Sequence, residues 1–329
     1  MIIVQTPLRV SLFGGGTDFP SYYSQNGGCV LSAAIDKYIF VTVKQRFDRK
    51  IRVGYTKTEM VDRIEEVQHE LIREALQKTG IRQGIEITTM GDIPSAGSGL
   101  GSSSTVTVGS LQAMYTYMGN IVTAEQLAKE ACEIEIDKLN KPIGVQDQYI
   151  VSLGGLRLIE FGKDGNITSR RLDLGEENYR LLSNNLMLFF TGITRKSSGI
   201  LREQKTRGSD NNQYLAQLKQ FAYEAYDQLE KGNIEIIGQM LHESWQIKKN
   251  LASSISNNRI EQVYEAARRA GALGGKISGA GGGGFLLLYC PYFYQTKVRE
   301  VLSDLQELPF SIERDGTKVI FNYRRVDMR

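Results

Sequence analysis

The sequence predicts a mixed α+β protein. Three features indicate this class: stretches with apolar residues at helical spacing, short runs rich in β-branched and aromatic residues, and glycine-rich turns that separate them. The 329 residues are enough for two domains or one large one. A change in composition around 175–185 marks a candidate boundary, and we therefore expect an N-terminal domain over 1–180 and a C-terminal domain over 181–329.

Strands are predicted at the start of the chain. Residues 2–15 form an edge-type strand that Pro7 breaks and that a glycine turn ends. Residues 38–46 are rich in β-branched and aromatic side chains and form a second strand, with residues 51–55 as its partner.

Helical spacing begins near Met60. Apolar residues recur at helical intervals from Val61 to Leu76 and predict a helix over 60–79, which Gly80 ends. The other elements predicted in this half are a strand over 84–94, a helix over 102–118, a helix over 123–139 with Thr123 and Gln126 as a capping box, and a turn around Asp147.

The second half mixes strands and helices. Residues 156–161 and 166–174 form a hairpin around the turn at 163–165. The remaining predicted elements are a buried strand over 186–192, helices around 211–231, 233–250 and 257–270, a strand after the glycine run at 281–284, a helix over 292–306 and a strand near 320–326.

Composition excludes several classes of protein. The net charge of +3 and the absence of a Lys/Arg block argue against a nucleic-acid partner and leave room for a small-molecule anion. No apolar run approaches the roughly 18 residues of a membrane span, and the N-terminus resembles a strand rather than a signal peptide. Three dispersed cysteines predict no disulfide framework and favour the reducing cytoplasm. The sequence does not indicate an oligomeric state.

Metal chemistry based on histidine is also excluded. The chain has two histidines, and the stretch HESWQ at 242–246 carries Gln246 where a zincin motif needs its second histidine.

Glycine-rich segments occur at 14–18, 94–104 and 276–285. None of them matches a common nucleotide-binding motif in full. A Walker A loop fails because Ile277 follows Lys276 and Ala270 replaces the first glycine. Residues 279–284 match G-x-G-x-x-G, but an apolar strand follows instead of a helix, which excludes the dinucleotide fingerprint.

The segment 94–104 does fit an anion site. A glycine loop that leads into a helix offers unpaired backbone N–H groups and the positive end of the helix dipole. The hydroxyls of Ser102, Ser103 and Ser104 can bind phosphate or Mg²⁺, which prefers oxygen ligands. Phosphoryl transfer also needs carboxylates, and composition alone does not choose among Glu130, Glu133, Glu135, Asp137 and Asp147.

A resemblance narrows this choice. PLRVSLFGGGTD (7–18), PSAGSGLGSSS (94–104) and GGKISGAGGGGF (274–285) resemble, in order, the three motifs of the GHMP small-molecule kinases. The second is the most specific, since it matches the pattern P-x-x-x-x-G-L-G-S-S from Pro94 to Ser103. The resemblance implies a ribosomal protein S5 domain 2-like N-terminal domain, a ferredoxin-like C-terminal domain and a site between them.

The resemblance also implies roles for single residues. Asp147 is the expected catalytic base, and Arg9 is expected beside it near the γ-phosphate. The expected Mg²⁺ ligands are Ser103 and Glu135, of which Glu135 lies twelve residues before Asp147. The expected ATP-binding residues are Pro94, Gly97, Ser98, Gly99, Leu100, Gly101, Ser102, Ser103 and Ser104.

The first motif bears on the substrate. Gly14-Gly15-Gly16-Thr17-Asp18 lacks the Glu and His of galactokinases and resembles D-glycero-D-manno-heptose 7-phosphate kinases, with L-fucokinases next. We therefore expect ATP, Mg²⁺ and a sugar phosphate as ligands. The alternative from another class of function is a sensor that binds ATP and sugar without catalysis. The role of Lys276 is left open between a contact to a ligand and a solvated lysine. The expected substrate contacts are Gly16, Thr17, Asp18, Arg195, Lys196, Gly281 and Gly282.

Overall fold

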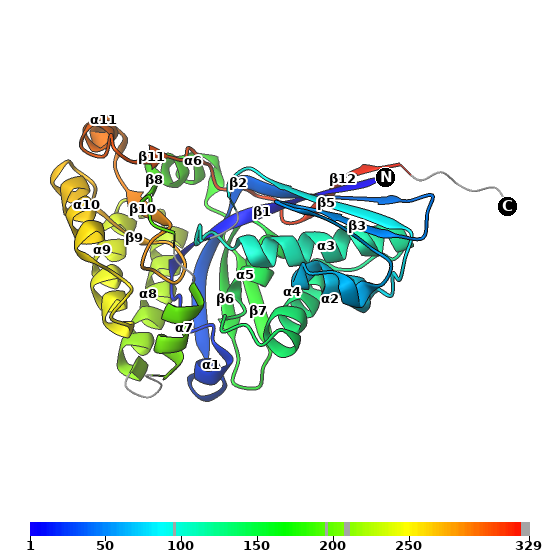
Figure 1. Cartoon of the computed structure of the whole chain (residues 1–329). Helices are drawn as coiled ribbons and strands as arrows, with labels where there is room; N and C mark the ends of the chain where they lie inside the picture. The colour runs from blue at the N-terminus through cyan, green and yellow to red at the C-terminus, as the bar shows by residue number, and fades with distance from the viewer. Residues whose placement is uncertain (95–96, 195–196, 207–210, 324–329) are drawn as a thin grey trace.

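The computed structural model describes residues 1–94, 97–194, 197–206 and 211–323, and these contain two β-sheets covered by helices (Figure 1). The α+β class is therefore confirmed. The larger sheet contains β1 (Ile2–Phe13), β2 (Gly28–Gln45), β3 (Ile51–Gly54), β4 (Thr58–Val61), β5 (Ile85–Gly91), β6 (Leu156–Phe161), β7 (Ile167–Arg171) and β12 (Lys318–Asn322). The smaller sheet contains β8 (Leu186–Phe190), β9 (Gly274–Ile277), β10 (Phe285–Tyr289) and β11 (Gln306–Glu307).

Helices cover both sheets in the described part of the chain. Those that lie between strands of the larger sheet are α1 (Pro20–Asn26), α2 (Glu70–Thr79), α3 (Ser102–Met118), α4 (Ala124–Cys132), a π-helix (Glu133–Lys138) and α5 (Gln146–Leu153). Those that follow are α6 (Gly175–Asn185), α7 (Ser197–Thr206), α8 (Asn212–Glu230), α9 (Ile236–Lys248), α10 (Asn258–Arg269) and α11 (Tyr292–Val301). No helix in the described ranges has the length and apolar character needed to cross a membrane.

The long strands β1 and β2 join the two parts of the molecule. They pair antiparallel, and α3 and α5 pack on them from one side (Figure 1). β2 pairs through its first half with β6 and through its second half with β5. From the other part, α8 contacts both long strands, and Phe221 stacks on Phe13 with ring centroids 6.5 Å apart. The helices of the second half therefore share apolar core with the larger sheet.

Two predictions about the first strands are wrong. β1 is an interior strand, because β12 and β2 flank it, and Pro7 does not break it. Pro7 is tolerated because β12 pairs with β1 only as far as Gln5, and the register with β2 shifts just after Pro7. β3 pairs with β5 and β4, and thus not with β2.

The helix predicted over 60–79 is wrong in its first half. β4 and a single 3₁₀ turn (Ile64–Glu66) precede α2, which begins at Glu70. The carboxylate of Glu59 accepts the backbone N–H groups of Gln68 and His69, and the His69 ring accepts that of Ile72. These bonds fix the start of the helix at this point.

The other predicted elements match with small differences. The hairpin, the strand at β8 and the helices at α3, α8, α9 and α10 are confirmed. The last predicted helix ends earlier, at Val301. A domain boundary near residue 180 stays a prediction. The end of the described chain, β12, lies in the larger sheet beside the start of β1 (Figure 1).

Candidate active site

A cavity of about 280 Å³ lies where the three glycine-rich segments meet. Residues from 15–18, 97–104 and 278–283 form most of its wall. Side chains from helices and strands complete it, among them Arg9, Ser11, Glu135, Gln146, Asp147, Leu201, Gln204 and Lys248.

The loop before α3 depends on glycine. Gly97, Gly99 and Gly101 all have positive φ, which other residues rarely adopt. Gly101 is the N-terminal cap residue of α3, and a Cβ there would lie 3.1 Å from the Arg9 side chain and 3.4 Å from Asp147. The backbone N–H groups of the first turn of α3 therefore face the cavity beside Arg9 and Asp147, where an anion can approach them.

The second and third glycine segments pack backbone against backbone. A Cβ on Gly99 would lie 2.5 Å from the Ser278 carbonyl oxygen, and one on Gly284 would lie 2.6 Å from that of Ser98. The Ser278 hydroxyl donates to the Gly99 carbonyl oxygen at 3.0 Å. The loop at 278–284 therefore supports the loop at 97–101.

We expect Gly99→Ala to displace this support. The added methyl group clashes with Ser278, and the φ of +73° at Gly99 adds strain. Thermal stability should fall, and the KM for ATP, the ligand expected from the sequence, should rise by about tenfold or more, which corresponds to roughly 1.4 kcal/mol. Gly165→Ala is the matched control, because Gly165 has a φ of +84° in a hairpin turn and nothing lies within 4 Å of its Cβ position. An unchanged KM in Gly99→Ala would contradict the expectation that this loop binds the phosphates of ATP.

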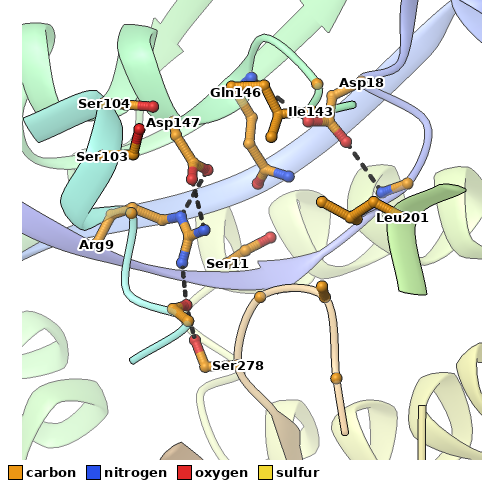
Figure 2. Close-up of a pocket in the computed structure, with 18 of the residues that line it drawn as sticks. Arg9, Ser11, Asp18, Ser103, Ser104, Ile143, Gln146, Asp147, Leu201 and Ser278 are labelled. Atoms are coloured by element: carbon orange, nitrogen blue, oxygen red, sulfur yellow. Dashed lines mark hydrogen bonds and ion pairs between the residues drawn. The ribbon is translucent and has the colours of Figure 1, made fainter. Parts of the chain in front are cut away.

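Arg9 and Asp147 form a bidentate ion pair in the cavity wall (Figure 2). Arg9 Nε and Nη2 each donate to one oxygen of Asp147 at 2.7 Å, and Nη1 donates to the Gly99 carbonyl oxygen at 2.7 Å. The arginine side chain is 5% exposed and the aspartate side chain 22%. Asp147 lies in the first turn of α5, so the predicted turn at this position is wrong. One guanidinium thus links the expected base to the loop at 97–101.

Ser103 and Glu135 meet beside this pair. The Ser103 hydroxyl donates to Glu135 Oε2 at 2.8 Å. Glu135 is fully buried, Oε1 has no hydrogen-bond partner in the described residues, and burial raises the pKa of the carboxyl to about 7. Glu135 lies in the π-helix that continues α4, so the predicted helix over 123–139 has the right extent but not a uniform type. Such π segments often occur at functional sites.

These two residues fit Mg²⁺. No cluster of three or more His, Cys, Asp or Glu side chains in the described part of the chain could hold a metal ion by itself. Mg²⁺ is nevertheless commonly held by one or two carboxylates together with substrate phosphates. The unpartnered Glu135 Oε1 and the Ser103 hydroxyl supply the oxygen ligands that such a site needs.

Asp18 faces the same cavity from the first glycine segment (Figure 2). Its Oδ1 accepts the backbone N–H of Gly16 at 3.0 Å. Burial and, after it, the charge of Asp147 raise the pKa of Asp18. Gly144 gives Asp18 its space, because a Cβ at residue 144 would lie 1.9 Å from Asp18 Oδ2. The carboxylates of Asp18 and Asp147 thus serve one cavity from two different segments.

Some expected site residues lie elsewhere. The Thr17 hydroxyl donates to the carbonyl oxygens of Gly14 and Cys29 and holds the turn together behind the cavity. Lys276 is buried and donates to Ser11 and Leu12 carbonyl oxygens, so the solvated alternative is wrong. Pro94, Leu100 and Gly282 are not among the residues that line the cavity, whereas Gly281 is. Arg195 and Lys196 lie outside the described residues.

Sequence reasoning missed several cavity residues. Ser11 Oγ and Gln146 Oε1 are buried without a hydrogen-bond partner in the described part of the chain, and Gln146 directly precedes Asp147. Lys248 continues the buried stripe of α9 that includes Leu241, Ser244 and Trp245. A cation at an apolar position of a helix was the signal that could have identified it.

Known families match both parts of the chain. The model "GHMP kinases N terminal domain" matches residues 65–155, and "GHMP kinases C terminal" matches residues 225–308. A D-glycero-alpha-D-manno-heptose 7-phosphate kinase of Campylobacter jejuni is 31% identical over 96% of this chain and 98% of that protein. This chain belongs to the GHMP kinase family. As a GHMP kinase it is an ATP-dependent phosphotransferase with an alcohol acceptor.

Two further relatives bear on the substrate and the fold of this GHMP kinase. An L-fucokinase/L-fucose-1-P guanylyltransferase of Bacteroides fragilis is 26% identical over 86% of this chain and 34% of that protein. The crystal structure of a D-glycero-D-manno-heptose 1-phosphate kinase from Bacteriodes thetaiotaomicron superposes with a TM-score of 0.82, covering 98% of this chain and 100% of that one at 24% identity. This last likeness supports the two-sheet GHMP kinase fold.

Proposed function

We propose that this kinase phosphorylates the anomeric hydroxyl of a sugar phosphate, with D-glycero-D-manno-heptose 7-phosphate as the first candidate and the 1,7-bisphosphate as its product. The observation that carries the proposal is the bidentate Arg9–Asp147 pair, which lies against the glycine loop and start of α3 beside Ser103 and Glu135. An acceptor hydroxyl at Asp147 would then lie next to the phosphates on this loop, as in-line transfer requires.

The chain positions ATP through its backbone. Amides of 97–104 and the positive end of the α3 dipole bind the phosphates, and the serine hydroxyls of the first turn add donors. Ser103 and Glu135 would hold Mg²⁺, which would supply positive charge to neutralise the phosphate oxygens. No lysine of the loop itself contributes, since residues 97–104 contain none.

Asp147 receives or directs the proton of the acceptor hydroxyl. Arg9 occupies one lone-pair direction of each carboxylate oxygen, and the remaining directions can accept the hydroxyl. The same guanidinium places a fixed positive charge where the phosphoryl group is transferred. Arg9 therefore orients the base and stabilises the developing charge.

Asp18 and its neighbours form the acceptor side. The buried Asp18 carboxylate, the Ser11 hydroxyl and the Gln146 amide supply hydrogen-bonding groups suited to sugar hydroxyls. The GGGTD motif and the kinase of Campylobacter jejuni support a heptose 7-phosphate as the acceptor. Arg195 and Lys196 stay proposed contacts for the substrate phosphate.

L-Fucose is the second candidate acceptor, because the enzyme of Bacteroides fragilis also matches most of this chain. A coupled assay of ADP release with heptose 7-phosphate, L-fucose, mannose and mannose 6-phosphate separates the two. A higher kcat/KM for fucose than for the heptose phosphate would overturn the first choice. No ADP release with any sugar, despite ATP binding, would favour a sensor.

Glu135→Gln should raise the Mg²⁺ concentration needed for half-maximal activity. The amide keeps the shape of the side chain but replaces one anionic oxygen with a nitrogen that does not bind Mg²⁺. Glu133→Gln is the matched control, because Glu133 lies two residues away and pairs at the surface with Lys78 at 2.7 Å. Titration of MgCl₂ at saturating ATP measures both. If Glu133→Gln raises the requirement instead, Glu135 is not the ligand.

A further inference from the structure

Two buried lysines lie at or next to the candidate active site. Lys248 at the end of α9 is 6% exposed, and Lys276 in β9 is 3% exposed. Within the described ranges, both ammonium groups bond to backbone carbonyl oxygens and neither forms an ion pair with a carboxylate. A buried cation without a carboxylate partner is costly unless another anion accompanies it.

The two lysines differ in how many of their N–H groups remain available to a ligand. Lys276 Nζ donates to the carbonyl oxygens of Ser11 at 2.8 Å and Leu12 at 3.0 Å, and it ties β9 to β1 away from the cavity wall. Lys248 forms part of the cavity wall, and among the described residues its Nζ has only the Gly279 carbonyl oxygen, at 2.7 Å, as a partner. An ammonium has three N–H groups. Two of those on Lys248 are therefore available to a ligand.

Charges around Lys248 favour an anion. The charged groups that face it are Arg9 from β1, Asp18 from the loop after β1, and Lys276 from β9. Arg9 is already paired with Asp147, so among the described residues that face Lys248, Asp18 is the one carboxylate left to offset the two lysines. Burial and the charge of Arg9 lower the pKa of Lys248 to about 8, while Asp18 raises it.

Hydrogen bonds also connect Lys248 to Arg9 through the third glycine segment. Gly279 follows Ser278, whose hydroxyl bonds to the Gly99 carbonyl oxygen, and Arg9 bonds to that same oxygen. A short series of contacts thus runs from Lys248 through the third glycine segment to Arg9. The ammonium group is thus connected through the third glycine segment to the Arg9–Asp147 pair in the same cavity.

We propose that Lys248 binds a phosphoryl oxygen of a substrate on the acceptor side of the cavity, which Asp18 and its neighbours form. The inference rests on the proposed function, and the oxygen has two sources: a phosphate that the acceptor already carries, or the γ-phosphoryl group during transfer. Lys248 is thereby assigned a role in ligand binding that its neighbour Lys276 lacks.

Kinetics of Lys248→Met and Lys276→Met separate the sources. If the acceptor phosphate is the ligand, Lys248→Met raises the KM for a phosphorylated sugar about tenfold or more and leaves the KM for ATP and for the plain sugar within about twofold. If the γ-phosphoryl group is the ligand, kcat falls with both sugars alike. Lys276→Met should lower the melting temperature and leave these constants nearly unchanged. Equal effects of the two substitutions on the kinetic constants would overturn the inference.

A pH profile tests the charge itself. The ammonium of Lys248 is present below its pKa of about 8, so kcat/KM of the wild type should fall as the pH rises above that value. This decline should be absent in Lys248→Met, should move to higher pH in Lys248→Arg, and should persist in Lys276→Met. A decline that persists unchanged in Lys248→Met contradicts the assignment.

Binding of inorganic phosphate gives a readout without turnover. With ADP and Mg²⁺ saturating, millimolar phosphate should raise the melting temperature of the wild type and of Lys276→Met more than that of Lys248→Met. If no sugar supports ADP release but this difference is present, the proposed function fails and the anion site stands. If sugars are phosphorylated but the difference and the kinetic effects are absent, the function stands and the anion site fails.

Discussion

Asp147→Asn should abolish most turnover while ATP still binds. The asparagine has the shape of aspartate but cannot take a proton from the acceptor, and its NH₂ group faces a donor of Arg9 in place of one carboxylate oxygen. General-base catalysis contributes about 10²- to 10⁴-fold, so kcat should fall by an amount in this range. A coupled ADP assay measures kcat, and calorimetric titration with a non-hydrolysable ATP analogue measures binding.

A second asparagine variant provides the control. Asp137→Asn removes the same charge from the exposed end of the π-helix and should change kcat by less than about twofold. Near-normal kcat in Asp147→Asn would remove Asp147 from the role of base. Loss of ATP binding in that variant would show that Asp147 acts through the nucleotide site.

Periodicity in the sequence predicts the elements that lie on a surface of the core. α10 shows this well, since its buried residues Ile260, Val263, Tyr264 and Ala267 recur at helical intervals. The first half of β2 was missed because residues 28–35 are buried on both faces and show no alternation. The start of α2 was missed because the bonds from Glu59 that fix it are not visible as a pattern of apolar residues.

The candidate site likewise contains some residues that the sequence predicts and some that only the structure reveals. Spacing and family resemblance predict the roles of Ser103, Glu135 and Asp147, because the order of motifs along the chain carries that information. The contact between the loops at 97–101 and 278–284 brings together residues some 180 positions apart along the chain, as in the hydrogen bond from the Ser278 hydroxyl to the Gly99 carbonyl oxygen. No local sequence pattern reports such a contact. For Lys248 the sequence offered one signal, a cation at a buried position of a helix, but only the folded chain shows that α9 ends at the cavity.

Arg9 couples the two halves of this site, and Arg9→Lys should therefore be severely impaired although it keeps the charge. The guanidinium donates at once to both oxygens of Asp147 and to the Gly99 carbonyl oxygen. A lysine has a single nitrogen and cannot span these three acceptors, so the base loses its orientation and the loop loses one support. We expect kcat to fall by about 10²- to 10³-fold, similar to the loss of one donor that stabilises developing charge.

The double variant shows whether the two residues act as a unit. If Arg9 works through Asp147, then Arg9→Lys combined with Asp147→Asn should lose little more kcat than Asp147→Asn alone, because residues that share one function give non-additive losses. Arg157→Lys is the control: Arg157 also bonds backbone carbonyl oxygens, those of Leu153 and Gly154, but it lies outside the cavity and should leave kcat nearly unchanged. Fully multiplicative losses in the double variant would mean that Arg9 acts on the transferring phosphoryl group independently of Asp147.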